Sequence, residues 1–128
     1  MDKLNSLSGA DGTGTSISFA GFGPLSQANA VSASATAYSH RDTLFLYQFY
    51  SYGAKTNTVV SNLGQLVNQA KSIAPSSNAW GAYVNYVDRN LQGWGAAYYG
   101  SALAQLKALK QQLDPNNIFD YAQGLAHA

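Results

Sequence analysis

The chain has 128 residues, of which 10% are charged, and its formal net charge is +1. Its lysines and arginines are scattered and it has no cysteine, which excludes a basic nucleic-acid-binding face, disulfides and thiolate chemistry. No apolar run approaches the ~20 residues of a membrane span, and residues 1–10 lack the pattern of a signal peptide. We therefore expect no nucleic-acid or membrane partner, and the compartment stays unknown.

The first half of the chain predicts strands. Residues 16–20 alternate polar and apolar side chains, as in a short strand, and residues 21–34 have the Gly, Ala, Ser and Pro content of a long connection. A second strand is expected at residues 36–39 and a polar turn at residues 40–43. The strongest strand is expected at residues 44–52, which are dense in the aromatic residues that suit a pleated surface.

The second half predicts two helices around one more strand. Asn57 or Thr58 is expected to cap a helix that runs to Ile73, because its apolar residues recur at three- and four-residue spacing. Residues 80–88 alternate again and predict the last strand. A second helix is expected over residues 93–113, since Asp114-Pro115 would end it.

This order of elements predicts an α+β fold in a single domain, residues 1–128. The expected sheet is small and mostly antiparallel, with about four strands and both helices packed on one face. The other face would stay open and carry aromatic side chains. An exposed aromatic patch of this kind usually marks a ligand or partner surface.

The strand expected at residues 80–88 carries the first candidate site. Side chains alternate between the two faces of a strand, which puts Tyr83, Asn85 and Val87 on one face and Tyr86 on the other. A phenol can give or take a proton, so Tyr86 is a candidate for acid–base chemistry. The alternative is that these tyrosines simply pack the sheet.

Three motifs follow one another in the second half. Residues 82–88 are Ala-Tyr-Val-Asn-Tyr-Val-Asp, residues 95–100 are Gly-Ala-Ala-Tyr-Tyr-Gly, and residues 114–119 are Asp-Pro-Asn-Asn-Ile-Phe. In this order and at these distances they resemble the C-terminal segment of the berberine-bridge-type FAD-linked oxidases. Nothing in the chain resembles the flavin-binding domain of that family.

The resemblance implies roles for the residues of the first motif. The family residues that match Tyr83 and Asn85 contact the flavin, and the one that matches Tyr86 is a catalytic base in some members. The chain departs from the family pattern at Ala102, where Asn is usual, and at Gln105, where Arg is usual. These departures fit a protein that does not dock on a flavin domain, or an ordinary divergent member.

The second candidate site begins at His40 and Arg41. Tyr38-Ser-His-Arg is similar to a family motif that precedes a strand lining the substrate cavity, and His40 is a second candidate for moving a proton. The alternative for His40 is a turn residue bonded to Asp42. Either face of the following strand could line the cavity, so the ligand-binding candidates are Tyr83, Asn85, Arg41, Tyr47, Phe49, Gln48 and Tyr50.

Three hypotheses follow. The chain could be a flavin-free relative of the substrate domain, with no cofactor, that binds a small hydrophobic ligand and catalyses a cyclisation or isomerisation through Tyr86 or His40. It could instead be a fragment or subunit of an FAD-linked oxidase, with Tyr83 and Asn85 on the flavin. A third possibility is a non-catalytic binding module. No metal site is expected, and a homodimer through the open sheet face is plausible.

Overall fold

The computed structural model describes residues 14–23, 25–53, 56–73 and 80–128. The chain divides into two compact units. The first comprises Met1–Gly21 and Phe45–Trp80, and the second comprises Phe22–Leu44 and Gly81–Ala128. Whether the two form a single domain stays a prediction.

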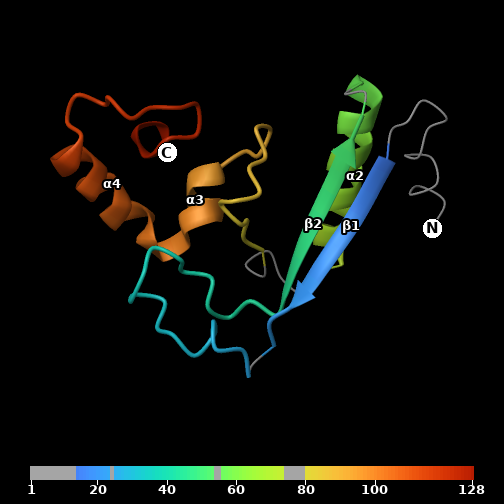
Figure 1. The fold of residues 1–128 in the computed structure, drawn as a ribbon, viewed down its shortest axis with the longest axis horizontal. Helices are drawn as coiled ribbons and strands as arrows, with labels where there is room; N and C mark the ends of the chain where they lie inside the picture. Colours follow the sequence, from blue (N-terminus) through green and yellow to red (C-terminus); the bar gives the residue numbers. More distant parts are fainter. Residues whose placement is uncertain (1–13, 24, 54–55, 74–79) are drawn as a thin grey trace. The chain divides into compact units, whose positions relative to one another are not determined.

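The first unit contains a two-stranded antiparallel sheet. Strand β1, Gly14–Gly21, pairs with β2, Phe45–Tyr52, and the register places Ile17 opposite Phe49 and Phe19 opposite Tyr47. Figure 1 shows the two strands as neighbouring arrows of opposite direction. The strands predicted at residues 16–20 and 44–52 are confirmed.

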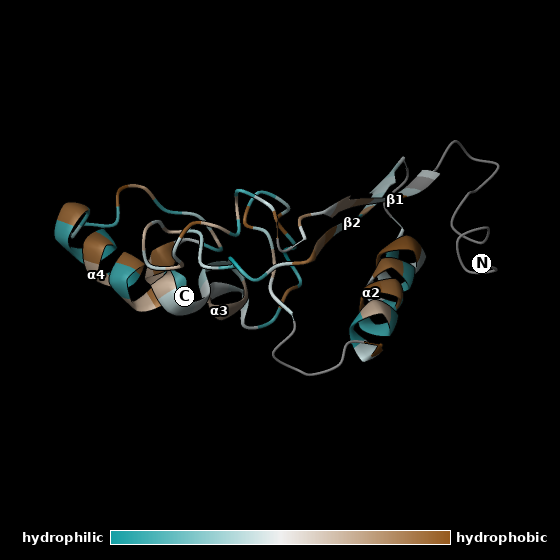
Figure 2. Cartoon of the chain, turned by 90° about the horizontal axis from the view of Figure 1, so that it is seen from below, coloured by the Kyte–Doolittle hydropathy of each residue, from teal (hydrophilic) through white to brown (hydrophobic). Residues whose placement is uncertain are grey.

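Helix α2, Asn57–Ser72, follows β2 and contacts it. Its cap is Thr56, whose Oγ1 accepts a hydrogen bond from the Val59 amide at 3.3 Å. The prediction of Asn57 or Thr58 as the cap is wrong, because Thr56 has the extended backbone of a cap residue and both of the others are already helical. The apolar stripe of α2 forms a brown band distinct from its teal side in Figure 2.

The second unit contains α3, Trp94–Tyr99, a short 3-10 turn η2, Gly100–Ala102, and α4, Leu103–Leu113, and it ends with a second such turn, η3, Leu125–His127. One continuous helix was predicted over residues 93–113. The break falls at Gly100, whose φ of 50° and ψ of −127° suit glycine alone. A side chain there would also begin 2.5 Å from the Ser39 hydroxyl.

Residues 36–39 are not a strand, contrary to the prediction. The Thr36 hydroxyl accepts a hydrogen bond from the Tyr38 amide at 3.3 Å, and the Ser39 hydroxyl donates to the carbonyl of Tyr99 at 2.8 Å. Short hydroxyl side chains of this kind offer the backbone a local alternative to a sheet ladder.

Residues 80–88 are not a strand either. The amide of Tyr86 donates to the carbonyl of Tyr83, which closes a turn, and the amides of Ala82 and Asp88 donate to partners on α3. The alternation of Tyr, Val and Asn is thus overridden by tertiary contacts, as strand propensity often is. Across the described residues the sheet has two strands instead of about four, while the α+β class is confirmed.

The best-buried side chains of the second unit lie behind this turn. Tyr98 of α3 is 3% exposed and Gln123 is 8% exposed. By contrast, no residue of α2 in the first unit is fully buried. The core of the second unit therefore supports the segment that carries the first candidate site.

Candidate functional site

Residues 82–88 form a turn that is fastened at both ends. At its start the Ala82 amide donates to the carbonyl of Ala97 at 2.8 Å. At its end the Asp88 amide donates to the Tyr98 hydroxyl at 2.9 Å, and the Asp88 carbonyl accepts from the Gln123 side-chain amide at 2.9 Å. The 82–88 turn is thus held by backbone and buried polar groups, which fixes its position on α3.

The turn brings together side chains that a strand would separate. The rings of Tyr83 and Tyr86 meet edge to face with centroids 5.2 Å apart, and Asn85 donates from its amide nitrogen to the Tyr83 hydroxyl at 2.8 Å. The predicted placement of Tyr83 and Tyr86 on opposite faces is therefore wrong. Tyr86 is 42% exposed, so the pair is open to a ligand or partner.

Two residues of the preceding loop complete the tyrosine cluster, which we define as Tyr38, His40, Tyr83 and Tyr86. The Tyr38 ring stands edge to face with Tyr83 at 6.3 Å and with His40 at 5.8 Å. Edge-to-face pairs at these distances are favourable arrangements of aromatic rings. The structure thus unites His40 with the Tyr83, Asn85 and Tyr86 group, which lies more than 40 residues further along the chain.

Arg41 supports this cluster from within the protein. Its guanidinium nitrogens donate to the carbonyl of Ala28 at 2.8 Å and to the Thr36 hydroxyl at 2.6 Å. Its guanidinium carbon lies 4.9 Å from the centre of the Tyr38 ring, as in a cation–π contact. These internal contacts give Arg41 a role in holding Tyr38, and its role in ligand binding stays a prediction.

His40 is hydrogen-bonded to the main chain. Its Nε2 lies 3.1 Å from the carbonyl oxygen of Tyr98, at the C-terminal end of α3. The alternative interpretation of His40 as a turn residue bonded to Asp42 receives no support from these contacts. Its imidazole instead joins residues 38–43 to α3, the helix to which the 82–88 turn is also hydrogen-bonded.

The candidates on β2 belong to the first unit. Tyr47 and Phe49 share one face with Phe45 and, across the strand pair, with Phe19; the Tyr47 ring stacks near Phe19 at 6.1 Å and near Phe49 at 6.5 Å. Phe19 is 69% exposed, so this aromatic face is open. Gln48 and Tyr50 lie on the other face. That these residues share a cavity with the tyrosine cluster stays a prediction.

The 114–119 motif forms a cap at the end of α4. The carboxylate of Asp114 accepts hydrogen bonds from the amides of Ile118 and Phe119, at 2.8 and 3.0 Å. Lys110 donates both to this carboxylate and to the carbonyl of Phe119. The hydrogen bond from Lys110 first, and then those two amides, lower the pKa of Asp114 below its usual range.

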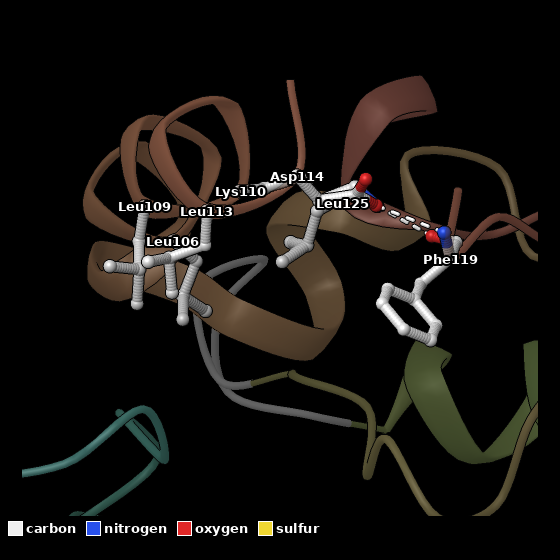
Figure 3. Close-up of a pocket in the computed structure, with 7 residues that line it drawn as sticks. All are labelled: Leu106, Leu109, Lys110, Leu113, Asp114, Phe119 and Leu125. Carbon is white, nitrogen blue, oxygen red and sulfur yellow. Dashed lines mark hydrogen bonds and ion pairs between the residues drawn. The ribbon is translucent and has the colours of Figure 1, made fainter. Parts of the chain in front are cut away.

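An apolar hollow lies beside this cap. Figure 3 shows Leu106, Leu109 and Leu113, which line the hollow from α4, and dashed lines that join Lys110, Asp114 and Phe119. Leu113 is 72% exposed and Phe119 is 82% exposed, so the hollow is open to its surroundings.

Other kinds of site find no support in the part of the chain that the structure describes. Three or more His, Cys, Asp or Glu residues grouped to hold a metal ion do not occur there. Among the described helices, none is long and apolar enough to cross a membrane. Burial and the neighbouring Tyr121 raise the pKa of Tyr99.

Sequence reasoning did not assign a role to Tyr38 or to the buried Tyr98. Tyr38 was visible as the aromatic residue two positions before His40. Tyr98 lies in the Gly-Ala-Ala-Tyr-Tyr-Gly motif, but its hydroxyl contact with residue 88 carries no signal in the sequence, since it depends on where the turn folds back.

The match to a known protein family lies in the second unit. Residues 82–126 match the family model described as berberine and berberine-like. This range contains the 82–88 turn, its anchor Tyr98 and its anchor Gln123. No solved structure matches the chain.

Several curated proteins are similar to most of the chain. A chitooligosaccharide oxidase of Gibberella zeae is 40% identical over 95 residues, covering 70% of this chain and 19% of its own length. A carbohydrate oxidase of Microdochium nivale is 38% identical over 109 residues, with 80% and 22% covered. A xylooligosaccharide oxidase of Thermothelomyces thermophilus is 36% identical over 113 residues, with 83% and 22% covered. The chain therefore spans about a fifth of the length of these relatives.

Proposed function

We propose that this chain, which belongs to the berberine-bridge-like family of FAD-linked oxidases, is the part of such an oxidase that presents the 82–88 turn to the flavin. The comparisons favour this hypothesis over a flavin-free cyclase, because the relatives include FAD-linked oxidoreductases and none of the findings points to a cyclase. The observation that carries the proposal is the turn itself. Hydrogen bonds to the buried Tyr98 and Gln123 hold its last residue in place, and the side chain of Tyr86 is exposed.

The groups on this turn fit one side of a flavin ring. An isoalloxazine ring is flat and carries carbonyl oxygens and nitrogen atoms along one edge. The Tyr83 hydroxyl oxygen accepts a hydrogen bond from the side-chain amide nitrogen of Asn85, so its O–H can still donate. The side-chain amide oxygen of Asn85 can accept a hydrogen bond. Tyr83 and Asn85 are therefore the residues we propose to contact the ring.

The chain's own part in the reaction is to position groups and move a proton. FAD, when bound, supplies the capacity to accept a hydride, which no amino-acid side chain has. Tyr86 lies beside Tyr83 and is exposed at 42%, so a substrate can reach its phenol oxygen. As the phenolate, this oxygen would take the proton of a substrate hydroxyl and become the neutral phenol. We propose Tyr86 as the catalytic residue of this segment.

We also propose a carbohydrate as the substrate class, in place of a hydrophobic natural product. Three relatives at 36–40% identity are a chitooligosaccharide oxidase, a carbohydrate oxidase and a xylooligosaccharide oxidase. The aromatic face of Phe19, Tyr47 and Phe49 supports this choice, because flat rings can pack on the apolar faces of a sugar and the Tyr47 hydroxyl can hydrogen-bond to sugar hydroxyl groups.

The proposal is tested in the organism that carries this sequence. An antibody raised against residues 80–128 should capture a flavin-containing assembly from a native extract, with the absorbance bands of a flavin. Within it, the sequence should lie in a polypeptide several times larger than 13.6 kDa or beside a flavin-binding subunit. A captured 13.6 kDa chain without flavin or a second polypeptide would refute the proposal.

The substrate class needs a separate assay. With the captured assembly, peroxide release should be faster with oligosaccharides than with hydrophobic phenols or alkaloids. A preference for the hydrophobic compounds would overturn the carbohydrate assignment and leave the flavin assignment standing.

A further inference from the structure

The His40 imidazole is hydrogen-bonded to the main chain through Nε2 and packs beside Gly81. A carbonyl oxygen only accepts hydrogen bonds, so the contact from Nε2 to the Tyr98 carbonyl at 3.1 Å requires the proton on Nε2. A Cβ at residue 81 would lie 2.7 Å from Nδ1 and 2.4 Å from Cε1 of the ring. His40 thus fills the space that the missing side chain of Gly81 leaves.

This packing gives the two ring nitrogens different roles. Nε2 carries the proton and donates it to the Tyr98 carbonyl, while Nδ1 carries the lone pair and lies beside Gly81, two residues before Tyr83. The hydrogen bond of Nε2 gives His40 a structural role, and proton transfer by Nδ1 stays a prediction.

A chain of ring contacts leads from His40 to the exposed tyrosines. His40 meets Tyr38 at 5.8 Å, Tyr38 meets Tyr83 at 6.3 Å, and Tyr83 meets Tyr86 at 5.2 Å, with interplanar angles of 74°, 89° and 86°. Each ring therefore presents an edge to a neighbour's face, and turning one of them disturbs the next. The end of this chain that is fixed to the main chain is His40.

We infer that His40 is a positioning residue: its Nε2–H bond to the Tyr98 carbonyl sets the orientation of the Tyr83–Tyr86 pair through Tyr38. The inference concerns this chain alone. Only the role of the Tyr83–Tyr86 pair beside a flavin rests on the proposed function. The positioning role of His40 would therefore hold even if no flavin were found.

The test uses the 128-residue chain with labelled tyrosine rings, read by NMR. His40→Phe keeps a ring against Tyr38 and removes the N–H donor. His40→Gln keeps an N–H donor the same number of bonds from Cβ and removes the ring. Ser39→Ala is the matched control, because it removes the adjacent bond from the same loop to α3, at the Tyr99 carbonyl, and leaves His40 intact.

We expect His40→Phe to lose the ring-to-ring cross-peaks between Tyr83 and Tyr86, with the Tyr121 signals unchanged. His40→Gln breaks the ring contact with Tyr38 and should also lose those cross-peaks, whereas Ser39→Ala should retain them. The inference is overturned if a folded His40→Phe protein keeps them, or if Ser39→Ala loses them equally. Should His40→Phe fail to fold, His40→Gln decides: lost cross-peaks in a folded protein support the inference, and retained cross-peaks refute it.

Discussion

Replacing Tyr98 by Phe removes one oxygen atom from behind the 82–88 turn. The ring of Tyr98 is 3% exposed and its packing is kept by Phe, while the Asp88 amide loses the hydroxyl that accepts it at 2.9 Å. A part-buried donor left without its acceptor costs about 1–3 kcal/mol. Since Asp88 itself is an exposed residue that water can reach, we expect a value near the lower end.

The assay is amide hydrogen exchange combined with urea unfolding. A cost of ~1 kcal/mol corresponds to roughly fivefold faster exchange at the Asp88 amide and to an equal loss in the free energy of unfolding. Tyr98→Ala also removes the buried ring, and truncating a large buried aromatic residue to alanine costs about 3–5 kcal/mol. The two variants therefore separate the hydroxyl from the ring.

The matched control is Tyr99→Phe, which removes the same hydroxyl one residue further along α3. The Tyr99 side chain interacts with Tyr121, and the bonds that hold the 82–88 turn come from Ala97, Tyr98 and Gln123. Exchange at Asp88 should stay as in the wild type in this control. Equal exchange at Asp88 in Tyr98→Phe and in the wild type would refute the idea that Tyr98 fastens the turn.

Three further predictions follow from the geometry. Gly81→Ala should lower the melting temperature and change the His40 ring signals in NMR spectra, because the new methyl group would begin 2.4 Å from the imidazole; an unchanged spectrum would contradict that packing. Tyr86→Phe should sharply reduce kcat of the captured oxidase and leave its flavin content unchanged, whereas full turnover would rule out Tyr86 as the proton acceptor. Asp114→Asn should destabilise the chain at neutral pH: the lowered pKa of Asp114 in the folded chain means that the ionised carboxylate adds stability above about pH 4, which is lost as the pH falls further. Thermal unfolding from pH 7 to pH 2 checks this, since the asparagine variant should show a smaller fall, and parallel curves would refute it.

Local patterns predicted the elements whose partners lie nearby in the sequence. The strand over residues 44–52 and the helix after Thr56 depend on residue type and spacing, and both were found. The 82–88 turn could not be predicted in this way. Its alternating pattern is that of a strand, and what bends it is a set of bonds to Ala97, Tyr98 and Gln123 that only the folded chain brings near.

The residues of the candidate site were chosen from the resemblance, and their arrangement could not be predicted from the sequence. The resemblance selected Tyr83, Asn85 and Tyr86, and the structure brings these three together with His40. The prediction that was wrong placed Tyr83 and Tyr86 on opposite faces of a strand, whereas the turn brings their rings into contact. Tyr38 was not predicted to belong to the tyrosine cluster, because a single aromatic residue before a polar turn does not by itself indicate a site.

The departure from the family pattern at Ala102 bears on whether the chain contacts a flavin. Alanine in place of the usual Asn fits either a protein that no longer docks on a flavin domain or an ordinary divergent member. In the structure, Ala102 ends the short η2 turn, and the bonds that fasten the 82–88 turn come from Ala97, Tyr98 and Gln123. Since none of these bonds needs a side chain at residue 102, Ala102 does not alter how the 82–88 turn is held. The departure therefore does not argue against the proposed flavin contact at this turn.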